Sequence, residues 1–440
     1  MLIELTFSCA YRRGNVENWL TSVQDMMITT LKNKLRDAFK STDFDRKKWV
    51  LEHPGQIVAA GSQILWCYNT EESIKEMEDE PNALENWYKT NSTNLIQLTD
   101  LVKTNLPPVK HMIIVALITT DVHARDIIEK LKENAVSSVS DFLWQQQLRY
   151  YFDNEAHICK VRQVNAELNY GYEYMGATSR LVITPLTDRC WMTITGALNI
   201  KLGAAPAGPA GTGKTESTKD LAKGLGMFCV VFNCSEQIEY QMMGRLFSGL
   251  AQQGAWACLD EFNRINVEVL SVIAQQLLDI RRAKLLMGDE RTEDYFEFMG
   301  KNMRIRMACG VFITMNPGYA GRTELPDNLK VLFRPVSMMI PDYGLIAEIM
   351  LFAEGFSVEN AKSLSQKMVR LYKLSSEQLS QQDHYDFGMR AVKSVLVMAG
   401  SLKRADQSLP EDVVLIRAMR DSNIPKFLKD DIPLFQAIIQ

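Results

Sequence analysis

The chain has 440 residues, of which 46% are hydrophobic and 23% charged, and its formal net charge is -4. This length allows two or three domains, and the ordinary apolar share excludes a largely disordered or fibrous protein. Because the charges nearly cancel, no overall field favours nucleic acid or an anionic membrane. No apolar run approaches the roughly 20 residues that a membrane span needs, and the start lacks a signal-peptide pattern. We expect a soluble chain with neither nucleic acid nor membrane as partner.

The eight cysteines are scattered without C-x-x-C pairs and mostly lie within apolar runs. This usage predicts reduced thiols in the core of a protein from a reducing compartment. Only five histidines are present, and the spacing of cysteine and histidine does not favour a zinc site. We therefore expect no metal ligand among the thiols.

Residues 1–168 are predicted to form a helical region, because apolar residues recur there at intervals of three and four. The acidic stretch 71–85 is interpreted as a solvated helix face and loop. The apolar, partly β-branched run 111–120 is compatible with a helix or a strand, and its position between helical patterns favours a buried helix.

Residues 169–340 change to short apolar runs separated by Gly, Pro and Asn, alternating with helical stretches, which is typical of a parallel α/β sheet. Near-continuous apolar runs are expected of central strands covered on both faces. The segment between Leu285 and Ile305 is predicted to form a hairpin insertion. The candidate strands are 181–184, 200–207, 229–234, 255–260 and 310–315.

Residues 341–440 return to helical spacing, chiefly over 344–375 and 386–402. They are predicted to form a small helical lid. The fold class expected from the sequence is therefore an α/β module, with a parallel sheet flanked by helices and a helical lid, preceded by an all-α region.

A phosphate-binding loop is predicted at 208–215, where GPAGTGKT fits G-x-x-x-x-G-K-[ST] between a candidate strand and a helical stretch. Glycines let backbone N–H groups surround phosphate oxygens, Lys214 reaches the β- and γ-phosphates, and Thr215 ligates Mg²⁺. The strand-to-helix context argues against a mere glycine-rich turn. The sequence thus predicts ATP and Mg²⁺, bound by Gly208, Pro209, Ala210, Gly211, Thr212, Gly213, Lys214, Thr215 and Glu216.

An acidic pair, Asp260 and Glu261, ends the apolar run AWACL, at the sheet edge where open α/β folds bind ligands. Asp260 is expected to orient the magnesium shell, and Glu261 to position and activate the attacking water. An isolated acidic pair is also a common helix cap. The phosphate-binding loop upstream favours the catalytic interpretation.

Two further polar residues are weaker candidates from position alone. Asn316 follows the run GVFITM and precedes Pro-Gly, so holding the lytic water or γ-phosphate and forming a turn are equally compatible. Arg390 lies on a helical stretch of the lid, and one interpretation is that it reaches back to the phosphates. An arginine on a helix is usually just solvated.

With these pieces assembled, the chain resembles dynein heavy chains over essentially its full length. The resemblance rests on 180–191, 203–226, 254–265, 312–330 and 384–396. It implies that residues up to about 168 correspond to the carboxyl end of the linker, the lever that docks on the motor ring. The remainder corresponds to the large and small parts of the first AAA+ ring module, and the chain is then a fragment.

The resemblance also assigns roles to the candidate residues. The segment Leu181 to Pro185 matches the family's stretch beside the adenine, which makes Leu181, Val182 and Ile183 expected base contacts. The remaining matches are Lys214 and Thr215 to Walker A, Asp260 and Glu261 to Walker B, Asn316 to sensor I and Arg390 to sensor II.

Two positions need comment. Arg334 occupies the place where many AAA+ modules keep an arginine finger for the nucleotide site of a neighbouring module. In dyneins that neighbouring module resembles a non-hydrolysing one, so we expect a structural role for Arg334. Leu259 stands where the family usually has Phe, which changes packing and not chemistry. The amino-acid sequences of segments 230–240 and 184–191 resemble axonemal dyneins more than cytoplasmic dyneins.

The function implied is ATP hydrolysis coupled to linker movement and force along microtubules, in the cytoplasm, cytoskeleton and ciliary or flagellar axoneme. Implied partners are the microtubule, through parts absent from this chain, the neighbouring AAA+ modules, and dynein intermediate, light intermediate and light chains. Without the neighbouring modules, this chain is expected to hydrolyse ATP only weakly. Rival classes are a nucleotide-gated scaffold, disfavoured by Glu261, a P-loop phosphotransferase, and a DNA-directed AAA+ ATPase, disfavoured by the charge balance.

Overall fold

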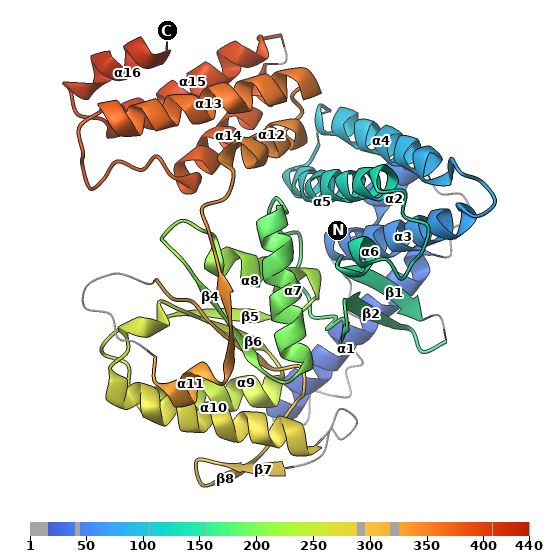
Figure 1. The fold of residues 1–440 in the computed structure, drawn as a ribbon, viewed down its shortest axis with the longest axis vertical. Helices are drawn as coiled ribbons and strands as arrows, with labels where there is room; N and C mark the ends of the chain where they lie inside the picture. Colours follow the sequence, from blue (N-terminus) through green and yellow to red (C-terminus); the bar gives the residue numbers. More distant parts are fainter. Residues whose placement is uncertain are drawn as a thin grey trace.

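The computed structural model describes residues 16–39, 45–104, 106–153, 155–287, 295–316, 325–406 and 408–439. Along the chain an N-terminal region is followed by a central sheet with flanking helices and then by a C-terminal bundle of helices (Figure 1). Over the described residues, none of the helices combines the length and hydropathy that a bilayer crossing requires.

The N-terminal region is mostly helical, as predicted. The run 111–120 lies inside a 26-residue helix, and four of its apolar side chains have no more than 7% of their surface exposed, so the buried-helix prediction is confirmed. The helices are α1 (Val16–Ala38), α2 (Arg46–Glu52), α3 (Gly55–Glu76), α4 (Ala83–Val102), α5 (Pro108–Glu133) and α6 (Phe142–Gln145).

The prediction that this region is all-α is wrong, because it ends in a three-stranded antiparallel sheet. In the central strand Cys159, Val161 and Gln163 are buried while Arg162 is exposed, which is the two-residue alternation of a strand with one covered face. Charged residues on the open face hid that period in the sequence. The strands are β1 (Arg149–Asp153), β2 (Ile158–Gln163) and β3 (Ala166–Asn169).

The central sheet has five strands, all parallel, in the order β10-β4-β9-β6-β5. Four of the predicted strands are confirmed. Because β4, β9 and β6 are neighbours, the residues that follow them meet at one edge of the sheet. The bounds are β4 (Gly203–Ala207), β5 (Cys229–Asn233), β6 (Trp256–Asp260), β9 (Gly310–Ile313) and β10 (Phe333–Ser337).

The predicted strand over 181–184 is wrong. Leu181 N donates to the carboxylate of Asp220 and not to a neighbouring strand, and Thr184 is the N-cap of helix α7 (Pro185–Asn199), with a capping box to Thr187. Conversely, β10 was not predicted. Arg334 and Pro335 interrupt its apolar pattern, and Arg334 is exposed on this strand at the sheet edge.

Helices cover both faces of the sheet, so the residues of each strand divide between two cores. In Figure 1, α8 (Lys214–Gly224) lies above the sheet, α7 stands upright at its right-hand end, and α9 (Tyr240–Gln253) and α10 (Val267–Met287) lie below it. Along β6, Trp256 belongs to the first core, while Ala257 and Leu259 belong to the second.

The predicted hairpin insertion is confirmed by β7 (Tyr295–Phe298) and β8 (Lys301–Arg304), which pair antiparallel; residues 288–294 of that segment lie outside the described part. A single helical turn, α11 (Asp327–Lys330), precedes β10.

The C-terminal bundle contains more helices than the two predicted stretches suggest. The stretch 344–375 is divided at Gly355, whose φ of +98° ends the first helix in a conformation that favours glycine. The helices are α12 (Tyr343–Ala353), α13 (Val358–Gln378), α14 (Met389–Ala405), α15 (Glu411–Asn423) and α16 (Asp431–Ile439).

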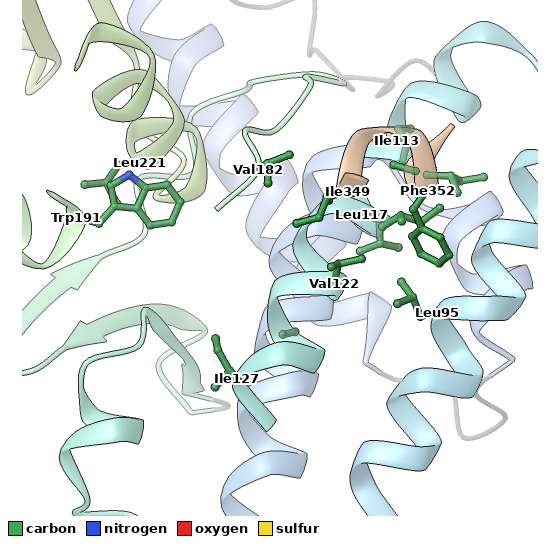
Figure 2. Packing of buried hydrophobic residues seen from close by; sticks show 14 of the residues in the cluster. Leu95, Ile113, Leu117, Val122, Ile127, Val182, Trp191, Leu221, Ile349 and Phe352 are labelled. Atoms are coloured by element: carbon green, nitrogen blue, oxygen red, sulfur yellow. The ribbon is translucent and has the colours of Figure 1, made fainter. Parts of the chain in front are cut away.

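One hydrophobic core joins the N-terminal region, the upper face of the sheet and the C-terminal bundle (Figure 2). It includes Ile113 and Leu117 of α5, Val182 before α7, and Phe352 of α12. α12 packs directly on α5 and α4. The bundle is therefore anchored on the N-terminal helices, with the phosphate-binding loop beneath it.

The cysteines among the described residues are free thiols, and six of the seven are buried. Burial raises the pKa of Cys159 and of Cys190 to about 12. No group of three or more His, Cys, Asp or Glu side chains suited to a metal ion occurs in the described ranges.

Candidate nucleotide-binding site

The loop 208–213 connects β4 to α8 and depends on its glycines. Gly211 and Gly213 have φ of +78° and +79°, in the left-handed region that favours glycine. Gly208 packs so tightly that a Cβ there would lie 2.2 Å from the carbonyl oxygen of Met338. The strand-loop-helix geometry expected of a phosphate-binding loop is therefore present.

The ammonium group of Lys214 is held inside this loop, with only 8% of the residue's surface exposed. Its Nζ donates to the carbonyl oxygens of Gly208 at 2.9 Å and Pro209 at 2.7 Å. The Thr212 hydroxyl also donates to Pro209, at 2.9 Å. The loop thus places one positive charge among its own backbone carbonyls.

Thr215 and Asp260 meet across the gap between α8 and β6. The Thr215 hydroxyl donates to Asp260 Oδ1 at 2.7 Å. Thr314, just beyond β9, also donates its hydroxyl to Asp260 Oδ1 and accepts a hydrogen bond from Glu261 N at 3.0 Å. A hydroxyl and a carboxylate, both oxygen ligands of the kind that Mg²⁺ binds, therefore lie side by side.

Thr314 was not predicted as a site residue, although it is fully buried and holds both members of the acidic pair. The signal was a single hydroxyl at the end of the apolar run GVFITM. Because β9 and β6 are adjacent and parallel, a polar residue just beyond one strand faces the residues that end the other.

Glu261 has a backbone φ of +53°, an uncommon conformation for a residue with a side chain. Asn316 Nδ2 donates to its Oε1 at 3.3 Å. Arg264 Nε lies 2.6 Å from its Oε2. Asn316 is 6% exposed, and its buried Oδ1 has no hydrogen-bond partner among the described residues. Asn316 and Arg264 are thus the donors that the described residues supply to this carboxylate, and of these the sequence predicted Asn316.

The segment 180–184 is tied to the helix that follows the loop. Arg180 forms an ion pair with Asp220 of α8 at 3.1 Å, with side chains 10% and 2% exposed. Leu181 N donates to the same carboxylate at 3.1 Å, and Trp191 Nε1 donates to Ser217 O at 3.0 Å. Buried charges persist when paired and hydrogen-bonded in this way, so these contacts fix the segment against the helix.

A cleft of about 1740 Å³ brings most of the predicted residues together. It is bounded by the sheet edge, the C-terminal bundle and one face of α5. Arg390, in the first turn of α14, lines this cleft from the bundle. The other predicted residues on its walls are Leu181, Val182, Ala210, Gly211, Thr212, Gly213, Lys214, Thr215, Glu216, Asp260, Glu261 and Asn316.

Three predicted residues do not line the cleft. Gly208 and Pro209 begin the loop, and their carbonyls accept from Lys214. Ile183 faces a separate small cavity beside His123 and Trp191. Leu181 and Val182 face the cleft, whereas Ile183 faces this second cavity.

A phosphate-binding loop on a five-stranded parallel sheet, an acidic pair and an asparagine after adjacent strands, and a helical bundle beside the cleft define a P-loop module of the AAA+ class. Residues 170–440 match the family model described as the hydrolytic ATP binding site of the dynein motor region. Since this match covers more than half of the chain, the chain belongs to the dynein heavy chain family.

Individual relatives agree with the family match. The chain is 57% identical to dynein axonemal heavy chain 6 of Homo sapiens over 432 residues, which are 97% of this chain and 10% of that protein. It is 50% identical to dynein axonemal heavy chain 1 of Mus musculus over 438 residues, 99% of this chain and 10% of that protein. The chain thus spans about a tenth of the length of these relatives.

Among solved structures, the Thermotoga maritima RuvB Holliday junction branch migration motor gives a TM-score of 0.36 at 13% identity, covering 58% of this chain and 75% of that one. A likeness at this level carries no argument about function.

Proposed function

We propose that this chain binds ATP with Mg²⁺ and hydrolyses it, as the ATPase module of an axonemal dynein motor. Two hydrogen bonds carry the proposal: Thr215 donates to Asp260, and Asn316 donates to Glu261. Both lie at the edge of the sheet where β6 and β9 end. A phosphate-binding loop alone also serves proteins that do not hydrolyse. A hydroxyl–carboxylate pair beside an oriented second carboxylate matches what hydrolysis needs.

In this proposal Lys214 exchanges its acceptors, the carbonyls of Gly208 and Pro209, for the β- and γ-phosphate oxygens. Thr215 and Asp260 would hold Mg²⁺, whose positive charge offsets that of the phosphates. The fit rests on the 2.7 Å contact between their oxygens, which leaves a hydroxyl and a carboxylate facing the same space.

Glu261 is the proposed base for the attacking water, and Asn316 the residue that orients both. Alignment of the nucleophile is a large part of catalysis of phosphoryl transfer. Arg390 would approach the phosphates as the bundle closes, because it lies on the opposite wall of the same cleft. Leu181 and Val182 would bound the base.

We further propose that residues 1–168 act as linker, 169–340 as the large part of the module and 341–440 as its lid. Packing of α12 on α4 and α5 supports coupling between lid and linker. By analogy with the axonemal relatives, the partners would be neighbouring AAA+ modules and other dynein chains. The microtubule would be a partner through parts outside this chain.

One observation favours the alternative, a scaffold that binds ATP without hydrolysing it. Both carboxylate oxygens of Glu261 are engaged, one by Asn316 and one by Arg264. A carboxylate held by these two donors is turned toward them, which leaves it less available to an attacking water.

The two functions separate in a single-turnover experiment with γ-labelled ATP and excess protein. Hydrolysis predicts phosphate release by the wild-type chain that falls at least about 100-fold in Glu261→Gln, the scale expected when a group acting on the attacking water is lost. The scaffold predicts bound ATP recovered intact from both. Labelled protein in place of free phosphate would indicate a phosphotransferase.

A further inference from the structure

Helix α5 of the N-terminal region touches both halves of the nucleotide-binding module. Just beyond the middle of the helix, His123 Nε2 lies 3.5 Å from Asp188 Oδ1 in the first turn of α7. In the first turn of α5, His111 Nε2 lies 3.9 Å from Glu354 Oε2, which follows α12. At 1.5 Å per residue these two contacts are about 18 Å apart along the helix. Between them α5 runs beside the cleft.

One face of α5 lines that cleft. Its lining residues recur at intervals of three and four, the spacing of a single helical face. In Figure 2, Val182 lies between Trp191 of α7 and the side chains of α5, and these residues share one core. The lining residues of this face are Pro108, His111, Met112, Val115, Ala116 and Thr119.

The loop wall of the cleft and the central face of α5 differ in chemistry, although Lys103, Glu354 and Arg404 also line the cleft. The wall at the phosphate-binding loop carries Lys214, Asp260 and Glu261, whereas the central face of α5 offers Met112, Val115 and Ala116, none of them charged. Met112 keeps 43% of its surface exposed although it is apolar. An apolar wall with a small residue at its centre suits a flat heteroaromatic ring.

We propose that α5 completes the nucleotide site, and that Met112, Val115 and Ala116 contact the base of ATP whose phosphates lie on the loop. Val182, from the segment held by the Arg180–Asp220 pair, forms the facing wall. This inference rests on the proposed function. It means that the base touches the N-terminal region directly, so a nucleotide that enters or leaves changes the packing of α5 without acting through the sheet.

Photolabelling of the full chain with an azidoadenine analogue of ATP tests the contact. The expected result is ATP-competable label on a peptide containing 112–119, together with label on 179–187. Label confined to 179–187 or to the C-terminal bundle would overturn the proposal and leave the ATPase function standing. An absence of competable label anywhere would overturn the proposed function and this inference with it.

Variants separate a base contact from general disturbance. Ala116→Leu is expected to weaken Mg-ATP binding at least 10-fold and to leave binding of inorganic tripolyphosphate within 2-fold, because only the former carries a base. Val109→Leu is the matched control: it lies on α5, is 52% exposed and does not line the cleft. Equal losses for both ligands in Ala116→Leu would contradict the proposal.

If Ala116→Leu fails to fold, Met112→Ala provides the same comparison. Its side chain is largely exposed, so truncation should spare the fold. Loss of ATP affinity of about 3-fold, with tripolyphosphate unchanged, is the expected result. Unchanged affinity for both ligands would remove Met112 from the base site and overturn the proposed wall.

Discussion

Asn316 Nδ2 donates to Glu261 Oε1 across 3.3 Å, from the residues that follow two neighbouring parallel strands, β9 and β6. The amide is buried, and its Oδ1 has no partner among the described residues. A buried acceptor left in this way costs free energy unless a donor arrives. An attacking water, between the amide oxygen and the carboxylate, is such a donor.

Removal of this amide should therefore affect turnover more than binding. Asn316→Ala is expected to lower single-turnover phosphate release about 100-fold, comparable to loss of one positioned donor at other active sites, and to change Mg-ATP affinity by less than about 3-fold. Parallel calorimetry and phosphate release measure both. Asn302→Ala, exposed on β8, is the control. Equal loss of binding and turnover would assign Asn316 a structural role instead.

Thr314→Val keeps the shape of a buried side chain and removes its hydroxyl. Glu261 N then loses its acceptor, and Asp260 loses a donor. The free energy of unfolding should fall by about 1–3 kcal/mol, the cost of an unsatisfied buried group, with weaker Mg²⁺-dependent ATP binding. Thr193→Val is the control, because it removes a hydroxyl that donates only within its own helix. Its free energy of unfolding should change by less than about 0.5 kcal/mol. Equal effects in urea titrations would contradict this role.

Asp220→Asn should be the most destabilising of these changes. It leaves the guanidinium of Arg180 buried without its carboxylate. Breaking a buried pair by removing one partner costs about 3–5 kcal/mol. Asp421→Asn removes an exposed partner, 3.7 Å from Arg417 and 54% exposed, and should cost about 0.5 kcal/mol or less. Similar unfolding midpoints for both variants would refute the structural role of Asp220.

Stability should depend on pH through His111. Burial, and then the nearby Arg404 guanidinium, lower the pKa of its imidazole to about 4. The unfolded chain binds a proton below about pH 6.5 that the folded chain excludes. This contribution is therefore present above pH 6.5 and is lost as the pH falls to about 4.

Comparison with His111→Gln isolates this proton, because other groups, including the buried Glu354 beside it, titrate in both proteins. Between pH 7 and pH 5 the wild type should lose more unfolding free energy than the variant, by roughly 1 kcal/mol after allowance for solvent screening of the half-buried imidazole. Parallel loss in the two proteins would mean that the folded chain accepts the proton on His111.

Much of the site was predictable because the residues that follow parallel strands meet at one edge. The loop 208–215, the pair Asp260 and Glu261, and Asn316 each follow an apolar run, so the strand pattern alone placed them together. Strand order supplied what the sequence lacked: only the adjacency of β9 and β6 brings Thr314 onto Asp260.

Contacts between distant segments were not predictable. The pairing of Arg180 with Asp220 spans 40 residues and made 181–184 a tethered loop where its apolar pattern suggested a strand. The approach of α5 to the cleft depends on how the N-terminal helices dock on α7 and α12. No local pattern encodes that docking, since the cleft-facing residues of α5 are ordinary residues of an amphipathic helix.

The central claim, that the loop 208–215 is a working nucleotide site, is tested most directly by Mg-ATP binding to the full chain, measured by calorimetry for the wild type, Lys214→Ala and Glu261→Gln. We expect binding by the wild type and by Glu261→Gln, and loss of binding in Lys214→Ala, because this variant lacks the ammonium group proposed to contact the phosphates. No binding by the wild type, or equal binding by all three proteins, would contradict this claim.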